Sequence, residues 1–155
     1  MKKMNNKGFS MVELIIVIAI MAILAAALAP ALIKYINKSR LSSDVSTGTS
    51  IASAIQTAMS NESAYNDCGD STNASFGGPK GLNPFKGNMA KEVASTIDPS
   101  KCVVKAKKDM DGSEFDSSAF IVTVKPTDNT VEVYVGDTKH MCSPSVAKSL
   151  TEKSK

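Results

Sequence analysis

Acidic side chains that could bind a metal cation gather in one short stretch of the sequence, DMDGSEFD at residues 109–116. Asp109, Asp111 and Asp116 offer carboxylate oxygens, the hard ligands that Ca²⁺ takes, and their spacing is similar to the start of a calcium-binding loop. The spacing does not continue to a glutamate at the twelfth position of such a loop. A solvated Asp-Gly turn between two strands is therefore the favoured interpretation, with calcium binding as the alternative.

Cysteine chemistry depends on three residues, Cys68, Cys102 and Cys142. If they lie outside the cytoplasm, their odd number predicts one disulfide and one free thiol, and the sequence does not choose among the three pairings. Reduced cysteines in an anaerobic host are one alternative. Three buried thiols that act as small hydrophobic side chains are another.

Catalytic and cofactor sites have no positive indication in the sequence. His140 is the one histidine, and even with Cys142 it would need further ligands to hold a transition metal. No pair of a nucleophile and a base is apparent. The glycine-rich residues 61–88 lack the Gly-Lys-Ser/Thr of a phosphate-binding loop. We therefore expect no enzyme, no cofactor and no resident metal.

The elements that position these residues are organised around an apolar stretch at residues 9–33. From Leu14 to Ile33, 20 residues carry no charge, and a helix of that length rises about 30 Å, the thickness of a bilayer's hydrocarbon core. Glu13 stands at the start of this run. An ionised carboxylate inside hydrocarbon costs roughly 2.5 to 3.5 kcal/mol, so we expect a cationic partner nearby; the alternative is a carboxylate that reaches the membrane interface.

Residues 1–8 provide that partner if they are removed. The stretch MKKMNNKG carries three lysines and no acid, and it ends in the small, flexible Gly8. Cleavage between Gly8 and Phe9 would turn the backbone nitrogen of Phe9 into an ammonium group. In a helix that starts at Phe9, this group lies one turn before Glu13, where the two charges neutralise each other.

Residues 1–60, roughly, resemble the N-terminus of type IV pilins and of the related pseudopilins of type II secretion. The resemblance rests on a basic leader that ends in Gly8, on Phe9, on Glu13 at the fifth position of the cleaved chain, and on an apolar helix that contains Pro30. Met11 stands where leucine is more usual, a substitution that conserves volume.

The resemblance implies the processing and assembly steps of a filament subunit. The precursor would enter the cytoplasmic membrane, lose its leader to a prepilin peptidase after Gly8, and be N-methylated at Phe9. The pilus assembly machinery would then polymerise it with copies of itself into an extracellular filament on the cell surface. A type IV pilus subunit is our first interpretation, and the major pseudopilin of a type II secretion system is its close alternative.

Two further alternatives come from other classes of protein. One is an uncleaved, membrane-anchored extracellular binding module, and the other is a secreted binding protein cleaved near Ala27 or Ala29. The leader lysines favour a cytoplasmic N-terminus. Because Lys34, Lys38 and Arg40 flank the other end of the apolar run, the predicted topology rests mainly on the resemblance.

The charge balance excludes one class of partner. The net charge is +3, but the leader supplies three of the 18 basic side chains and none of the 15 acidic ones, so the cleaved chain carries 15 of each. With 5% aromatic residues and no basic stripe among them, no contact with nucleic acid is expected. A near-neutral surface suits subunits that pack against copies of themselves.

Helical periodicity continues over residues 34–60 as an amphipathic segment, and Asp44 falls among the polar residues of that segment. The apolar stripe recurs at steps of four and three, at Leu41, Val45, Gly48, Ala52, Ile55 and Met59. We expect one helix from Phe9 to about Met59, its second half packed on a globular domain. Pro30 predicts a kink or local melting over residues 26–30.

Residues 61–155 are expected to form the globular head. Gly, Asn, Asp, Ser and Pro dominate residues 61–88, which predicts a long loop before a short helix at residues 89–97. Alternation predicts strands at residues 102–107, 119–125 and 130–135, the last two as a hairpin, and a loop after Gly136. The expected fold class is α+β, with a long N-terminal spine helix on a small antiparallel sheet of three or four strands.

Overall fold

The computed structural model describes residues 8–78, 81, 83–116 and 118–151 of the 155-residue chain. The predicted leader, apart from Gly8, lies outside the described residues. The chain divides into two units, Met1–Ile36 and Asn37–Lys155, and helix α1, Met11–Met59, contributes residues to both.

The first unit contains the N-terminal part of α1, and every one of its described residues is exposed. Within the described part of the chain, α1 is the one helix that is long and apolar enough to cross a membrane. Pro30 lies inside α1, and the helix continues without interruption through residues 26–30. Melting of that segment stays a prediction for packed helices in a filament.

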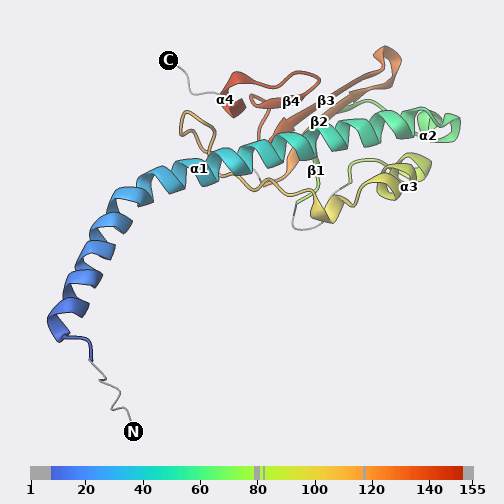
Figure 1. Cartoon of the computed structure of the whole chain (residues 1–155). Coiled ribbons are helices and arrows are strands. Elements are labelled where there is room, and N and C mark those ends of the chain that lie inside the picture. Colours follow the sequence, from blue (N-terminus) through green and yellow to red (C-terminus); the bar gives the residue numbers. More distant parts are fainter. Residues whose placement is uncertain (1–7, 79–80, 82, 117, 152–155) are drawn as a thin grey trace, which may run out of the picture. The chain divides into compact units, whose positions relative to one another are not determined.

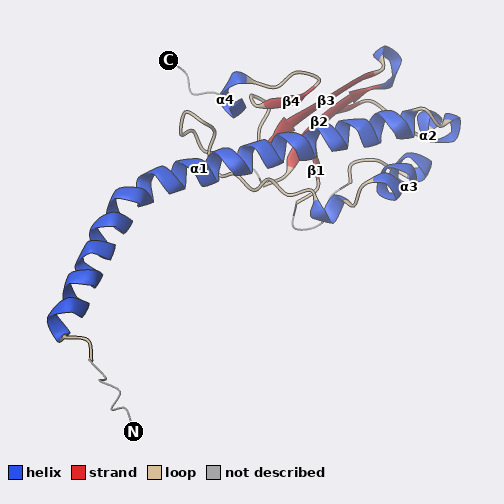
Figure 2. Cartoon of the chain, in the orientation of Figure 1, coloured by secondary structure: helices blue, strands red, loops and turns tan. Residues whose placement is uncertain are grey.

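The second unit packs the C-terminal part of α1 against a four-stranded sheet (Figures 1 and 2). Five of the six residues in the predicted apolar stripe are buried, and the sixth, Val45, is partly buried against the core. The buried side of α1 consists of Leu41, Asp44, Gly48, Ile51, Ala52, Ala54, Ile55, Ala58 and Met59. The amphipathic pattern therefore predicted the face on which α1 packs.

The sheet is antiparallel, with its strands in the order β1-β2-β3-β4. The bounds are Ser71–Phe76 for β1, Phe120–Lys125 for β2, Thr130–Val135 for β3 and Met141–Ser143 for β4. Strands β2 and β3 form the predicted hairpin through a 3-10 turn, Pro126–Asp128. Asn129, with φ of 49°, closes that turn in the left-handed region, which asparagine tolerates. The α+β class is confirmed.

The segment between α1 and β2 differs from the prediction of one long loop. It holds the short helix α2, Glu62–Asn66, whose N-terminus is capped by the Asn61 side chain, and then strand β1. Most residues of β1 are exposed or half-buried, so its sequence STNASF lacks the apolar alternation from which a strand is predicted. The short helix expected next is present as α3, Gly87–Thr96, and a 3-10 turn follows at Pro99–Lys101.

Two further predictions for the head were wrong. Residues 102–107 form no strand, because the backbone N–H of Val104 donates to Ser118 and the next two N–H groups donate to the side chain of Asp44. The chain after Gly136 is not only loop, since it forms β4 and helix α4, Lys148–Thr151. A three-residue strand is too short to show an alternating pattern.

At Gly48, α1 packs directly against side chains of strands β4 and β2. A Cβ atom at this position would overlap Cys142 Sγ and would lie 3.6 Å from Cε1 of Phe120. We expect Gly48→Ala to lower the free energy of unfolding by about 2 kcal/mol. Overpacking costs up to about 3 kcal/mol, and the better helix propensity of alanine returns only about 1. Urea denaturation of the full chain in detergent measures the change.

Cys142→Ala provides the matched background for this test. Once the sulfur is removed, the nearest atom to the new methyl group is Cβ of residue 142, at an ordinary contact distance of 3.4 Å. In that background, Gly48→Ala should be neutral or should stabilise the fold by up to about 1 kcal/mol. Equal costs of Gly48→Ala in both backgrounds would contradict a steric clash with the sulfur.

Candidate assembly site

The N-terminus of α1 is closed by a reciprocal pair of hydrogen bonds between side chains and backbone. Glu13 Oε2 accepts from the backbone N–H of Ser10 at 2.8 Å, and Ser10 Oγ accepts from the N–H of Val12 at 3.3 Å. This is a capping box, which satisfies N–H groups that have no partner within the helix. The Ser-x-x-Glu spacing of residues 10–13 is the sequence signal for it, and our sequence reading missed it.

Glu13 therefore has a different partner from the one expected for a helix that starts at Phe9. Helix α1 begins at Met11, so Phe9 precedes the helix and the carboxylate binds the next N–H along the chain, that of Ser10. The capping box places the carboxylate one residue away from the nitrogen that cleavage would convert to an ammonium. Pairing of Glu13 with that ammonium stays a prediction.

The helix then presents a continuous apolar surface. Gly8, at the predicted cleavage point, has no atom within 4 Å of the place where a Cβ would stand, and Phe9 is 89% exposed. Large apolar side chains that are at least 43% exposed follow at Met11, Val12, Leu14, Ile15, Ile16, Val17, Ile18, Ile20, Met21, Ile23, Leu24, Leu28, Leu32 and Ile33. A surface of this extent is unfavourable in water, so it requires cover from lipid or from other apolar helices.

A family model described as the prokaryotic N-terminal methylation motif matches the start of this surface. Residues 3–29 carry the motif. It is the leader signature of type IV pilins and pseudopilins, and it confirms the resemblance drawn from the sequence. The motif and the fold indicate a structural protein, and the motif implies processing by a prepilin peptidase. No solved structure gives a significant match to the chain.

Beyond the methylation motif, Asp44 connects α1 to the segment before β2. Asp44 is fully buried, and its two carboxylate oxygens accept from the backbone N–H of Lys105 at 3.0 Å, while Oδ2 also accepts from Ala106 at 2.8 Å. Its place among the polar residues of the amphipathic segment gave no indication of this burial. Its spacing, three residues after Leu41 and four before Gly48, puts it on the buried stripe and could have identified it.

The surroundings of Asp44 act on its charge in opposite directions. Burial raises the pKa of the Asp44 carboxyl above its ordinary value of 3.8. The hydrogen bonds from Ala106 and Lys105 lower the pKa by less, as do the nearby cationic side chains of Lys105 and Arg40. The N–H groups of Lys105 and Ala106 belong to no strand, so no neighbouring strand offers them a carbonyl acceptor. The Asp44 carboxyl takes the place of that acceptor.

The acidic stretch at residues 109–116 contains a turn around Asp111 and Gly112, but the turn differs from the expected solvated turn between two strands, because residues 102–107 form no strand and Asp109 is buried. Asp109 is buried, and its Oδ1 accepts from the backbone N–H groups of Asp111, Gly112 and Ser113 at 3.0, 2.8 and 2.8 Å. Gly112 has φ of 98°, a conformation that favours glycine. Asp111 and Asp116 are exposed. Among the described residues, no group of three His, Cys, Asp or Glu side chains is arranged to hold a metal ion.

His140 joins this turn to the connection between β3 and β4. Its Nε2 lies 3.1 Å from Asp109 Oδ2 and its Nδ1 lies 2.6 Å from Asp137 Oδ1, while Phe115 contacts the ring edge-on at 5.0 Å between centroids. Both ring nitrogens face carboxylate oxygens, and both can donate only in the imidazolium form. His140 therefore links the turn at residues 109–113 to Asp137, and each of its ring nitrogens already has a carboxylate neighbour.

The three cysteines are buried, free thiols in the structure. Each thiol donates to a backbone carbonyl: Cys68 to Gly69 at 3.9 Å, Cys102 to Asp98 at 3.4 Å and Cys142 to Val133 at 3.1 Å. Burial raises the pKa of all three, that of Cys142 to about 12, so the thiolate form that reacts is disfavoured. Disulfide pairing of two of them on export stays a prediction.

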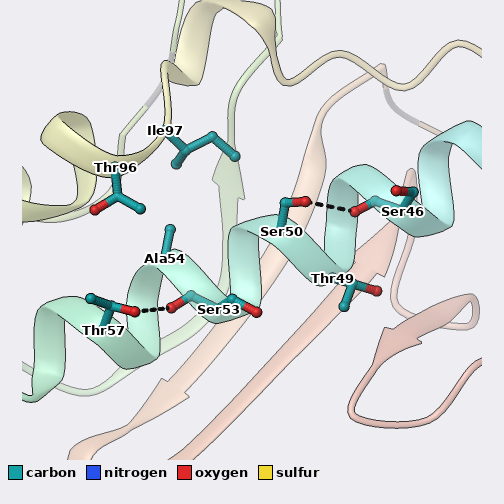
Figure 3. A pocket seen from close by; sticks show the side chains of 8 residues that line it. All are labelled: Ser46, Thr49, Ser50, Ser53, Ala54, Thr57, Thr96 and Ile97. Carbon is teal, nitrogen blue, oxygen red and sulfur yellow. Dashed lines mark hydrogen bonds between the residues drawn. The ribbon is translucent and has the colours of Figure 1, made fainter.

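A groove of about 570 Å³ runs along α1 beside the end of α3 (Figure 3). Hydroxyl groups line most of it, and those of Thr49, Ser50 and Thr57 donate to carbonyls four residues earlier in α1. The described residues that line the groove include no ionisable side chain: Ser46, Thr49, Ser50, Ser53, Ala54, Thr57, Thr96 and Ile97. They offer no acid, base or activated nucleophile.

Proposed function

We propose that the chain is the precursor of a type IV pilus subunit. It is cleaved after Gly8, N-methylated at Phe9 and polymerised through residues 9–33 into an extracellular filament. One observation carries the proposal: an exposed apolar helix, long enough to cross a bilayer, begins within the methylation motif. The globular unit that follows decorates the filament surface.

The mechanism is physical rather than catalytic. Before assembly, lipid covers residues 9–33 in the cytoplasmic membrane. During assembly, extraction of this surface from lipid is offset by burial of the same apolar area against the helices of other subunits. The partners are further copies of the chain, the prepilin peptidase and the pilus assembly machinery.

Glu13 sets the register of assembly in this proposal. Its carboxylate becomes tolerable in an apolar filament core only beside a cation, and the ammonium of a cleaved Phe9, its own or a neighbour's, is the nearest one available. The capping box supports the proposal, because it already holds the carboxylate beside the first residues of the cleaved chain.

The same features fit the major pseudopilin of a type II secretion system. Deletion of the gene separates the two functions. Loss of surface filaments with normal protein secretion supports the pilus subunit, whereas loss of secretion with unchanged surface filaments supports the pseudopilin.

Mass spectrometry of the exported protein tests the processing step. We expect a chain that begins at Phe9 and carries one extra methyl group on its amine. Gly8→Val should leave nearly all of the protein at precursor mass. A protease that accommodates glycine in extended form rejects the branched side chain, and no described atom of the protein lies within 4 Å of the new Cβ.

Gly69→Val is the matched control, since Gly69 is also free of neighbouring atoms within 4 Å. This variant should be cleaved and methylated like the wild type. Exported protein that begins at Met1 would favour the uncleaved anchored module, and protein that begins near residue 28 or 30 would favour the secreted binding protein. Either result would overturn the proposed subunit.

A further inference from the structure

Basic side chains gather at the end of the second unit where the chain leaves the apolar run. Segment 101–108 contains four lysines and no acid, and residues 38–43 contain two basic side chains and no acid. Hydrogen bonds described below hold the two segments side by side. Their exposed basic residues at this contact are Lys38, Arg40, Lys105, Lys107 and Lys108. We call these five residues the basic collar.

Hydrogen bonds fix the lysines of the collar beside α1. Asn37 Nδ2 donates to the backbone carbonyls of Lys108 at 3.2 Å and Asp109 at 3.4 Å. About two turns further along α1, the Asp44 carboxylate accepts from two backbone N–H groups, and the ammonium of Lys105 donates to Ser43 Oγ at 3.0 Å. Residues 105–109 are therefore held along α1 over residues 37–44.

The two collar residues of α1 flank this contact. Asn37 and Leu41 belong to the side of the helix that meets the rest of the unit. Lys38 follows Asn37 and Arg40 precedes Leu41, and each step along a helix turns by about 100°, so the two cations lie on opposite sides of the contact. The collar thus surrounds α1 on three sides at this level.

The covalent chain limits the distance between the collar and the membrane. Asn37 is four residues beyond Ile33, the last residue of the apolar run. Four residues span about 6 Å as helix and at most about 14 Å when extended. The headgroup layer on each side of a bilayer is roughly 5 to 8 Å deep. When residues 14–33 cross the membrane, the near end of the collar, where Lys108 meets Asn37, is held at or just above the headgroups, and the far end, where Lys105 meets Ser43, lies about 9 Å further along the helix.

Acidic groups near the collar leave it with an excess of positive charge. Lys108 forms an ion pair with Glu114 at 3.1 Å, and Asp116 lies in the same groove as Lys105 and Lys107. Asp111 is exposed on the neighbouring turn, whereas Asp44 and Asp109 are buried and bonded to backbone N–H groups. Five cations against three exposed carboxylates complement an anionic surface.

We propose that the basic collar binds the phosphate groups of anionic lipids in the membrane from which the subunit is extracted. The proposal rests on the membrane-spanning stage of the proposed function. A basic side chain close to an anionic membrane surface gains a contact that is lost on extraction. The collar therefore holds the unassembled subunit to the lipid headgroups and releases it when the subunit enters the filament.

Lysine acetylation in nanodiscs tests the proposal on the full-length chain. Acetic anhydride, an uncharged reagent, is applied to protein in discs of phosphatidylcholine alone and of equal parts phosphatidylcholine and phosphatidylglycerol. Peptide mass spectrometry then gives the acetylation rate of each lysine. We expect Lys105, Lys107 and Lys108 to react about fivefold more slowly in the anionic discs, and about 0.5 M NaCl should remove most of the protection.

The control lysines belong to the same molecule. Lys125 precedes Pro126, whose carbonyl accepts from Tyr65 beyond the far end of α1, and Lys91 lies in α3, which contacts α2 at that same end. These two should react equally in both discs. Equal protection of collar and control lysines, or none at the collar, would overturn the proposal. So would protection by inorganic phosphate without phosphatidylglycerol, or protection that grows with the number of chains per disc.

Matched triple variants provide a second readout. Lys105→Gln, Lys107→Gln and Lys108→Gln together should abolish the preference for phosphatidylglycerol among lipids retained in native mass spectrometry. Lys86→Gln, Lys91→Gln and Lys125→Gln together should preserve it.

Alkaline extraction of the wild type from vesicles tests the membrane-spanning stage separately from lipid binding by the collar. Release by alkali contradicts the membrane-spanning stage, whereas resistance to alkali without lipid preference contradicts the collar alone.

Discussion

Glu13→Gln is expected to reduce the number of surface filaments about tenfold or more, while membrane insertion and cleavage after Gly8 continue. Glutamine keeps the size of the side chain and an oxygen that can accept from the N–H of Ser10, so the capping box and the start of α1 are preserved. The substitution removes only the charge that would pair with the ammonium of Phe9. Loss of one partner leaves a buried charge uncompensated, and a cost of about 3 kcal/mol corresponds to more than a hundredfold in an equilibrium constant. Electron microscopy counts the filaments.

Ser10→Ala is the complementary control. It removes the hydrogen bond to Val12 and weakens the helix start by about 1 kcal/mol, but it keeps the carboxylate of Glu13. We expect this variant to assemble at close to the wild-type level. Normal filaments from Glu13→Gln together with few filaments from Ser10→Ala would assign the role of Glu13 to helix capping and would contradict charge pairing.

The N-terminal part of the chain was predictable because the features that identify it depend only on residues that are close together in sequence. A run of 20 uncharged residues, a basic leader and the spacing of Gly8, Phe9 and Glu13 are properties of neighbouring residues, and they led to the family resemblance that the methylation motif confirms. The capping box is equally local. Both interpretations of Glu13, a carboxylate paired with a cation and a carboxylate at the membrane interface, leave out Ser10, which stands three residues before it.

The head was predictable where burial alternates along the chain. Strand β3 has every second residue buried, and its sequence TVEVYV shows that pattern directly. Strand β1 shows no such pattern, because its position in the sheet comes from pairing with β2, 44 residues or more away in sequence. The opposite error occurred at residues 102–107, where Val104 and Ala106 are buried but the backbone binds Asp44 and Ser118.

Asp44 shows why such contacts escape sequence analysis. A carboxylate on a helix normally indicates the solvated face, and only its helical spacing from Leu41 and Gly48 argued otherwise. Its partners are backbone N–H groups about 60 residues later, which carry no signature in the sequence. The same contact holds Lys105 of the basic collar beside α1. Asp44 therefore positions part of the proposed lipid-binding surface.

Asp44→Ala is expected to lower the free energy of unfolding by about 3 kcal/mol. The substitution leaves the N–H groups of Lys105 and Ala106 without an acceptor, at about 1 to 3 kcal/mol each, and the relief of a buried carboxylate offsets part of this cost. Urea denaturation in detergent measures the stability. Hydrogen exchange supplies the local readout, because the amides of residues 105 and 106 should lose their protection before the rest of the unit does.

Ser43→Ala is the matched control, since it removes only the exposed bond to the Lys105 ammonium and should cost about 0.5 kcal/mol or less.

The pH dependence of the free energy of unfolding gives an independent check on Asp44. Because burial raises the pKa of Asp44 above 3.8, the folded chain holds a proton at this site more tightly than the unfolded chain does. The stability of the wild type relative to Asp44→Asn should therefore be constant at neutral pH and should rise as the pH falls from the raised pKa toward 3.8. A relative stability that falls over the same range would mean that the hydrogen bonds from Lys105 and Ala106 outweigh burial and that Asp44 is held as a carboxylate.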